Sequence, residues 1–234
     1  LPADPRRCLL SLSRGGADAV VVREFDTVAK RFVDGGFTVP EGKTRVTWID
    51  ADTLYIGTDF GPGSLTDSGY PRVIKRWSRG QALAEAVTVF EGERADVSAY
   101  AWVDATPGFE RQGFGRFTGF YDSRSVLLQR GKQVPLDKPI DASFSFWRDR
   151  VLIRLRSDWA VAGAFHPRGS LLVADAAAYL QGDRTLTALF TASATQSLEA
   201  FTTTRSTVIL TLLDKVTSRL EEWRPAPQGW QRRE

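Results

Sequence analysis

The sequence has few of the residues that form disulfides, metal centres and hydrolytic active sites. Among 234 residues there are one cysteine, Cys8, one histidine, His166, and no methionine or asparagine. A single cysteine excludes an intrachain disulfide, and we interpret Cys8 as a small apolar residue in a strand. A transition-metal site made of cysteine and histidine ligands is not predicted either. We therefore expect neither a metal nor another cofactor.

Long apolar runs are also missing. The sequence has no run of about 18 apolar residues, so it predicts no transmembrane helix, and its first residues lack the pattern of a signal peptide. We expect no membrane partner. Because the chain can form no internal disulfide, the sequence does not distinguish between a cytoplasmic and a periplasmic location. Because the chain does not begin with methionine, we expect it to be part of a longer protein.

Charge of one sign is not concentrated anywhere in the sequence. The 31 basic and 28 acidic residues give a net charge of +3. Nucleic-acid-binding proteins usually carry lysine and arginine clustered on one face. Here the basic residues are scattered, and adjacent arginines occur only near the two ends. A nucleic-acid partner is therefore not predicted.

What the sequence does contain is a series of short strands, seen most clearly in residues 44–92. Alternating apolar residues separated by turn residues predict an antiparallel meander there. In its second strand, Leu54 and Ile56 should lie on one face and Tyr55 on the other. The four predicted strands are 45–49, 53–58, 72–77 and 85–90. A four-stranded meander of about 40–50 residues has the size of one propeller blade.

Related units begin near residues 45, 97, 143 and 198, about 50 residues apart. The fold class we predict is an all-β partial β-propeller of four to five four-stranded blades. A β-sandwich would also show regular short strands and is the alternative. The chain would form one fragment, 1–234, in which the first blade is incomplete and lacks its first strand. The predicted blades are 7–40, 44–92, 95–137, 142–191 and 197–234.

Several local predictions follow the same reasoning. Asp34-Gly35 between two apolar runs predicts a hairpin of residues 31–33 with 37–39. Apolar residues in 212–223 have helical spacing, but the flanking Thr, Val and Ile residues favour a hairpin turning at Asp214-Lys215. Three further predictions are a strand within 114–121, an irregular insertion over 158–169 and a short helix over 176–180.

Motifs for catalysis are scarce. His166 lies in a predicted loop, and no Gly-x-Ser-x-Gly motif is present, so we assign no catalytic residue. Residues 36–44 resemble a P-loop, but the spacing is one residue too long and a strand follows where the phosphate site needs a helix. Asp50 and Asp52 are explained by turn chemistry. The candidate contact residues, chosen mainly because loops carry contacts more often than strands, are Phe60, Tyr70, Phe109, Arg111, Trp159 and His166.

Four segments resemble bacterial members of the prolyl oligopeptidase family. The longest is Ile56–Trp77, IGTDFGPGSLTDSGYPRVIKRW, and the others are 22–26 (VREFD), 106–111 (TPGFER) and 152–159 (LIRLRSDW). They occur in the same order as in that family. The family comprises serine peptidases in which a seven-bladed propeller caps an α/β-hydrolase domain that holds the Ser, Asp and His. Family members cleave short peptides, typically after proline.

The resemblance places this chain in the propeller only. It implies a non-catalytic domain that gates and selects substrates for a prolyl-oligopeptidase-like serine peptidase, and a chain that is inactive alone. Its partners would be the C-terminal hydrolase domain of the same parent chain and short peptides, which the six candidate residues would contact. Exposed blade edges would allow self-association. The alternative function is an autonomous β-propeller interaction scaffold, and a sugar-processing propeller enzyme would need a carboxylate pair that the sequence does not reveal.

Overall fold

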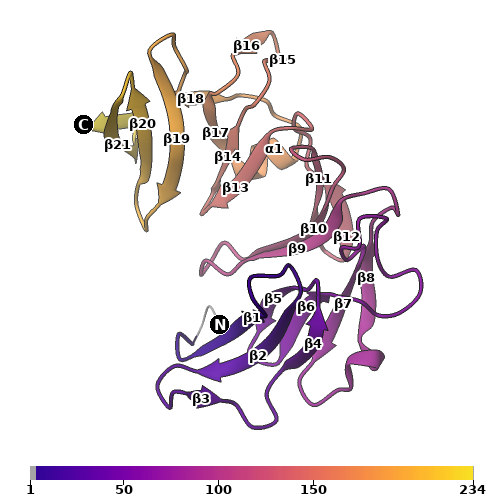
Figure 1. Ribbon diagram of the computed structural model, residues 1–234. Helices are drawn as coiled ribbons and strands as arrows, with labels where there is room; N and C mark the ends of the chain where they lie inside the picture. Colours follow the sequence, from indigo (N-terminus) through magenta and orange to yellow (C-terminus); the bar gives the residue numbers. More distant parts are fainter. Residues whose placement is uncertain (1–3, 234) are drawn as a thin grey trace. The chain divides into compact units, whose positions relative to one another are not determined.

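The computed structural model describes residues 4–233 and is built almost entirely of β-strands (Figure 1). Five four-stranded antiparallel sheets follow one another along the chain, and a small two-stranded hairpin accompanies the fourth. The chain divides into two compact units, Leu1–Leu136 and Asp137–Glu234. This confirms the predicted fold class. None of the helices in the described residues has the length and apolar character needed to span a bilayer.

The first unit contains three sheets. The first sheet consists of β1 (Arg7–Ser13), β2 (Val20–Asp26), β3 (Arg31–Phe32) and β4 (Thr38–Gly42). The second consists of β5 (Arg45–Asp50), β6 (Thr53–Gly57), β7 (Val73–Ser78) and β8 (Val87–Glu91), with the short 3-10 helix η1 (Leu83–Glu85) before β8. The third consists of β9 (Ser98–Asp104), β10 (Arg111–Phe117), β11 (Ser123–Gln129) and β12 (Lys132–Pro135). In the second and third sheets, each strand pairs with the next in sequence, as in a blade.

The second unit contains the fourth and fifth sheets. The fourth consists of β13 (Ser143–Trp147), β14 (Arg150–Arg154), β17 (Leu171–Asp175) and β18 (Thr187–Phe190). The hairpin of β15 (Trp159–Val161) and β16 (Ala164–His166) is inserted after β14, and helix α1 (Ala176–Leu180) precedes β18. The fifth sheet consists of β19 (Gln196–Thr203), β20 (Val208–Asp214), β21 (Thr217–Ala226) and β22 (Gly229–Arg233).

The core of the first unit lies between its sheets. Leu54 and Ile56 of β6 pack with Val22 and other residues of the first sheet. Tyr55, on the opposite face of the same strand, packs against Phe114 of the third sheet. The predicted division of β6 into two faces is therefore confirmed. All five residues of β6 are buried, because the second sheet has a neighbouring sheet on each face.

The second unit has the same alternation. Leu152 of β14 packs with Leu210 of the fifth sheet, whereas Val151 and Ile153 point to the other face and pack with Tyr179 of α1. Asp175 is the N-cap of α1, and its carboxylate accepts a hydrogen bond from the backbone N–H of Ala178. The predicted short helix is confirmed.

The predicted hairpin of 31–33 with 37–39 is wrong. Both segments pair with β2 instead of each other, so they form one interrupted strand. The backbone of Glu24 bonds across the interruption: its carbonyl accepts from Val33 N–H and its N–H donates to the carbonyl of Phe37. The intervening residues loop out, and Gly35 has a φ of 66°. The Asp-Gly turn signal here marks a bulge in one strand.

The first sheet is consequently three strands wide. The phenol of Tyr70, in the β6–β7 loop, donates a hydrogen bond to Asp18, in the β1–β2 turn. These two connections therefore lie together, so β1 and β2 correspond to the second and third strands of the neighbouring sheet. In the described residues the first sheet has no strand equivalent to β5.

Two further local predictions need correction, and one is confirmed. The predicted strand over 114–121 begins earlier and ends at Phe117, because the backbone of Thr118 closes a turn onto Asp122. The insertion predicted as irregular contains the ordered β15–β16 hairpin. The hairpin predicted at Asp214-Lys215 is confirmed by β20 pairing with β21, and Lys215 adopts a positive φ in the turn.

Candidate functional site

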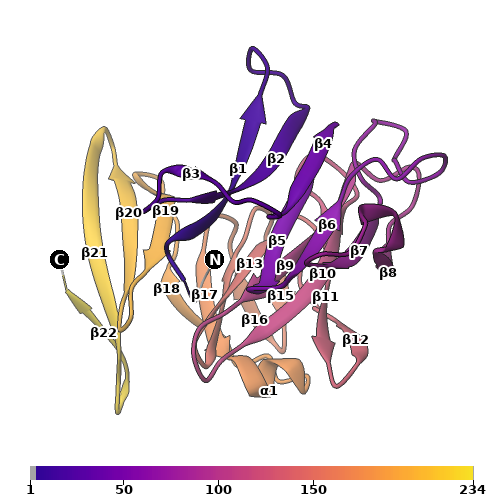
Figure 2. The same cartoon turned by 90° about the horizontal axis from the view of Figure 1, so that it is seen from below.

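The strands of the first unit end at two opposite edges. We call the edge with the β1–β2, β6–β7 and β10–β11 connections the loop edge, and the edge with the β5–β6, β7–β8, β9–β10 and β11–β12 turns the turn edge. In antiparallel meanders successive connections alternate between these edges. Figure 2 shows the β1–β2 turn and the β11–β12 turn at opposite ends of their sheets. The candidate residues of this unit can be assigned to one edge or the other.

The β6–β7 loop is the longest connection of the first unit and is tightly held by hydrogen bonds. The Ser64 hydroxyl accepts from Phe60 N–H and donates to Gly61 O at 2.7 Å. The Arg72 guanidinium donates to Gly63 O at 2.6 Å. The Thr66 hydroxyl donates to the carbonyl of Val97, just before β9. Long loops with this degree of internal order are commonly functional.

Tyr70 belongs to a small polar cluster at the loop edge. Its hydroxyl donates to the Asp18 carboxylate at 2.8 Å, and this bond raises the pKa of the phenol because it favours the protonated form. The Lys43 ammonium lies 3.8 Å from the same carboxylate and 4.0 Å from the centre of the Tyr70 ring. Lys43 is the lysine of the rejected P-loop match, and strand β5 follows it as expected.

Phe60 lies in the same loop but has different neighbours. Its half-buried ring packs on the core between the first and second sheets, and the Lys75 ammonium lies 4.4 Å from the ring centre. The structure thus places Phe60 and Tyr70 at the same edge, with Phe60 turned partly inward.

Phe109 and Arg111 are at the turn edge, where Phe109 lies in the β9–β10 connection and Arg111 is the first residue of β10. The Arg111 guanidinium donates to the carbonyl of Phe109 at 3.1 Å and lies 3.5 Å from the Asp104 carboxylate. At the loop edge, the β6–β7 loop is hydrogen-bonded to Val97, just before the beginning of β9. Phe109 and Arg111 instead follow the end of β9, at the opposite edge. The structure therefore does not bring these two residues together with Tyr70.

Trp159 and His166 are brought together in the second unit. They face each other across the β15–β16 hairpin, with ring centres 6.5 Å apart, and both are half-buried. The sequence placed both residues in an irregular insertion and could not predict this pairing. Within residues 4–233, no three His, Cys, Asp or Glu side chains are arranged to hold a metal ion.

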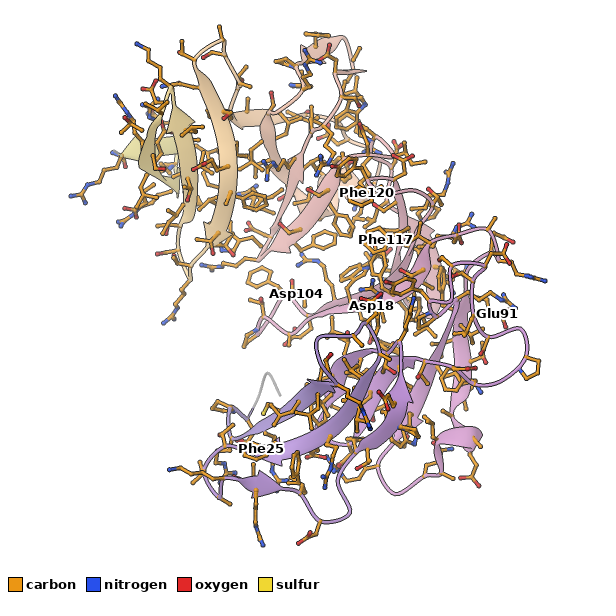
Figure 3. All side chains as sticks on the ribbon, in the orientation of Figure 1. Asp18, Phe25, Glu91, Asp104, Phe117 and Phe120 are labelled. Carbon is orange, nitrogen blue, oxygen red and sulfur yellow. The ribbon has the colours of Figure 1, made fainter. Side chains whose placement is uncertain are left out.

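Sequence reasoning missed an aromatic pair at the loop edge, Phe120 and Tyr121. Their side chains are 87% and 54% exposed, and the rings meet edge to face with centres 4.7 Å apart. The alternating pattern predicts a strand over these residues, although Gly119 before them and Asp122-Ser123 after them are turn residues that indicate a break. Figure 3 labels Phe120 together with Phe117, the last residue of β10.

A buried ion pair was also missed. The side chain of Glu24, in β2, is 1% exposed and accepts hydrogen bonds from the Arg79 guanidinium at 2.7 and 3.2 Å and from Phe37 N–H at 3.0 Å. Arg79 also binds Asp52 at 2.9 Å, and these hydrogen bonds raise the pKa of the guanidinium. The network joins the first and second sheets at the turn edge. No local motif signals it, since Glu24 and Arg79 are far apart in sequence.

The second unit has a pocket of about 230 Å³ beside α1. The Arg150 guanidinium in its wall lies between the carboxylates of Asp149 and Asp175, each 3.4 Å away. Tyr179 is largely buried, which raises the pKa of its phenol to about 12, and its hydroxyl donates to the carbonyl of Asp137. The remaining lining includes Asp183, Thr185 and Trp230. The polar groups of the pocket mostly bind one another, so we assign it no ligand.

Consecutive four-stranded antiparallel sheets with apolar faces packed together within each unit define the class of protein: the chain is part of a β-propeller. No protein-family model matches the chain. A search of known sequences does find relatives. An uncharacterized peptidase of Sinorhizobium fredii is 35% identical over 240 residues, which cover 98% of this chain and 33% of the relative. An uncharacterized peptidase of Rickettsia prowazekii is 29% identical over 245 residues, covering 97% and 34%.

Solved structures agree with these sequence relatives. A post-proline cleaving enzyme from Rickettsia typhi superposes with a TM-score of 0.89 at 27% identity, covering 97% of this chain and 36% of that enzyme. A prolyl endopeptidase structure shares the fold, with a TM-score of 0.68 at 15% identity. The chain is therefore homologous to the propeller portion of peptidases of the prolyl oligopeptidase family, and it spans about a third of the length of the relatives it matches.

Proposed function

We propose that this chain is the non-catalytic, substrate-gating propeller domain of a prolyl-oligopeptidase-like serine peptidase. The observation that carries the proposal is the extent of the homology. Nearly the whole chain aligns with one third of a peptidase, and nearly the whole chain also superposes on about a third of a solved post-proline cleaving enzyme. In the proposed parent protein, a following α/β-hydrolase domain supplies the catalytic Ser, Asp and His.

The physical basis of gating is steric. A propeller that covers an active site admits substrates only through openings of limited width, so short extended peptides pass and folded proteins do not. The fold supports this role because its sheets are joined by buried contacts within each unit. Buried aromatic and aliphatic residues pack them together within each unit, and Glu24 and Arg79 tie the first two sheets to each other. The substrates we propose are short peptides cleaved after proline.

The test compares this chain with the full-length protein on a chromogenic proline-containing peptide. We expect turnover by the full-length protein, abolished by a serine-directed reagent, and no turnover by residues 1–234 alone. Turnover by the 234-residue chain would contradict the proposal and would direct attention to His166. If neither protein cleaves the peptide, the gating proposal fails and an autonomous propeller scaffold becomes the better explanation.

A further inference from the structure

Several charged side chains near the loop edge of the first unit form ion pairs with one another. Lys43 lies 3.8 Å from Asp18, and Arg14 lies 3.6 Å from Glu41. Arg45 is an exposed arginine at the same edge. Within residues 4–233, no carboxylate lies at ion-pair distance from its guanidinium, and the guanidinium donates no hydrogen bond. The positive charge of Arg45 is therefore not neutralised by this part of the chain.

The position of Arg45 follows from the pairing of its strand. Arg45 is the first residue of β5 and lies opposite Gly57, the last residue of β6, so it is at the loop edge. Thr47, two residues later and on the same face, donates from its hydroxyl to the carbonyl of Ala101 in β9 at 3.4 Å. Arg45 thus lies on the face of β5 that is turned toward β9. In a propeller, such first strands of neighbouring sheets surround the central channel.

Aromatic rings lie beside the Arg45 guanidinium. Its central carbon is 5.8 Å from the centre of the Phe117 ring, which in turn lies 4.8 Å from the centre of the Tyr100 ring. Burial raises the pKa of the Tyr100 phenol, and the positive charge of Arg45 is one of the smaller effects that oppose this rise. The hydrogen bond to Asp18 raises the pKa of Tyr70, and Arg45 opposes that rise too. The guanidinium is therefore close to aromatic residues of both sheets.

A guanidinium in this setting is suited to bind a carboxylate. Its N–H groups form a planar fork that donates two parallel hydrogen bonds to the two carboxylate oxygens. The donors of Arg45 are unused within the described residues. A neighbouring aromatic ring favours the cation and keeps water from one side of it, which strengthens a charge-assisted hydrogen bond. A positive charge beside a channel also attracts anions that enter it.

From these contacts we infer that Arg45 is a specificity-determining residue that binds a carboxylate of the peptide substrate. The inference rests on the proposed function and deepens it, because it makes peptides with a negative charge near the cleaved bond the preferred substrates. The carboxylate belongs either to the C-terminus of the peptide or to an Asp or Glu side chain. A terminal carboxylate suits an enzyme restricted to short peptides, in which the C-terminus is always near the cleaved bond.

The experiment measures kcat/KM of the full-length protein on two pairs of internally quenched peptides, each containing one proline. The first pair ends in a carboxylate or in an amide, and the second pair, amidated throughout, contains glutamate or glutamine. We expect at least one carboxylate peptide to be cleaved about five-fold better than its neutral partner, the upper range for an exposed ion pair. The pair that shows the preference identifies the source of the carboxylate.

The variant Arg45→Gln should remove this preference, mainly by raising KM, and should leave cleavage of the neutral peptides unchanged. Arg45→Lys should keep part of it, because lysine retains the charge but not the planar fork. The matched control is Arg124→Gln. Arg124 is exposed at the same edge and likewise has no ion-pair partner within residues 4–233, but it lies in β11, away from β5 and β9. This variant should keep the full preference.

Three outcomes would overturn the inference: equal cleavage within both pairs by the unchanged protein, a preference that survives in Arg45→Gln, or a preference that Arg124→Gln removes as well. Binding separates the inference from the proposed function. Fluorescence anisotropy measures how the full-length protein binds labelled versions of the same peptides with alanine in place of proline. Arg45-dependent binding of a carboxylate peptide, without cleavage of any proline peptide, would refute the proposed function alone. Cleavage without a carboxylate preference would refute the role of Arg45 alone.

Discussion

The second and fifth sheets are built from similarly apolar strands but bury them differently. In β6 all five residues are buried, whereas in β20 buried and half-buried residues alternate. The second sheet packs against a sheet on each face, and the fifth packs against the fourth through one face. The apolar character of a strand therefore does not reveal how many of its faces are covered. The neighbouring sheets determine how many faces of a strand are covered. They therefore also determine how much each side chain of the strand contributes to the free energy of unfolding.

The largest effect should separate a core leucine of the second sheet from an exposed one of the fifth. Leu54 is 0% exposed, so Leu54→Ala leaves a cavity and should lower the free energy of unfolding by about 2–5 kcal/mol. Leu220 is 64% exposed, so Leu220→Ala should change it by less than about 0.5 kcal/mol. Denaturant titration measures both. Equal losses in the two variants would show that the outer face of the fifth sheet is covered.

The next effect concerns ion pairs. Glu24→Gln leaves Arg79 without its buried carboxylate, and we expect a loss of about 3 kcal/mol, since breaking a buried pair is costly although Arg79 is itself 30% exposed. The matched change in the fifth sheet is Glu222→Gln, which removes the ion-pair partner of Arg224. The Arg224 side chain is 57% exposed and the Glu222 side chain is 26% exposed. It should cost about 1 kcal/mol or less. If both changes cost the same, the Glu24 network does not join the first two sheets as described.

The smallest effect compares two hydroxyl groups. The Tyr55 phenol donates to the side-chain oxygen of Gln112 at 2.9 Å, so Tyr55→Phe should lower stability by about 1 kcal/mol. Thr211 is half-buried and pairs with exposed Leu220 on the outer face of the fifth sheet. Thr211→Val should therefore stay within about 0.5 kcal/mol of the unchanged protein. Thermal unfolding of the two variants checks the difference, which would vanish if the second and third sheets were not in contact at Tyr55.

The parts of the fold that the sequence predicts correctly are those set by local patterns. The alternation in 44–92 predicts the second sheet and the two faces of β6, and the turn residues at Asp214-Lys215 predict the β20–β21 hairpin. The errors occur where one local signal fits two structures. Asp34-Gly35 suits a hairpin and a bulge equally well, and only the backbone pairing of Glu24 with both sides decides between them.

The burial and the position of the candidate contact residues are harder to predict, because contacts between segments far apart in the sequence determine both. Placement in a loop located Phe60 and Tyr70 correctly but gave no sign that Phe60 packs inward on the core. Phe109 and Arg111 lie at the opposite edge from Tyr70, which follows from strand direction and not from residue type. The exposure of Phe120 depends on the exact end of β10, and strand ends are the least predictable part of a strand.

The central claim is that this propeller portion restricts a peptidase to short substrates. The most direct measurement compares cleavage by the full-length protein of a short proline-containing peptide and of the same peptide sequence inserted in an exposed loop of a folded protein. The account predicts cleavage of the short peptide and none of the folded protein. Equal cleavage of both substrates would contradict it, because an active site covered by the propeller could not admit the larger one.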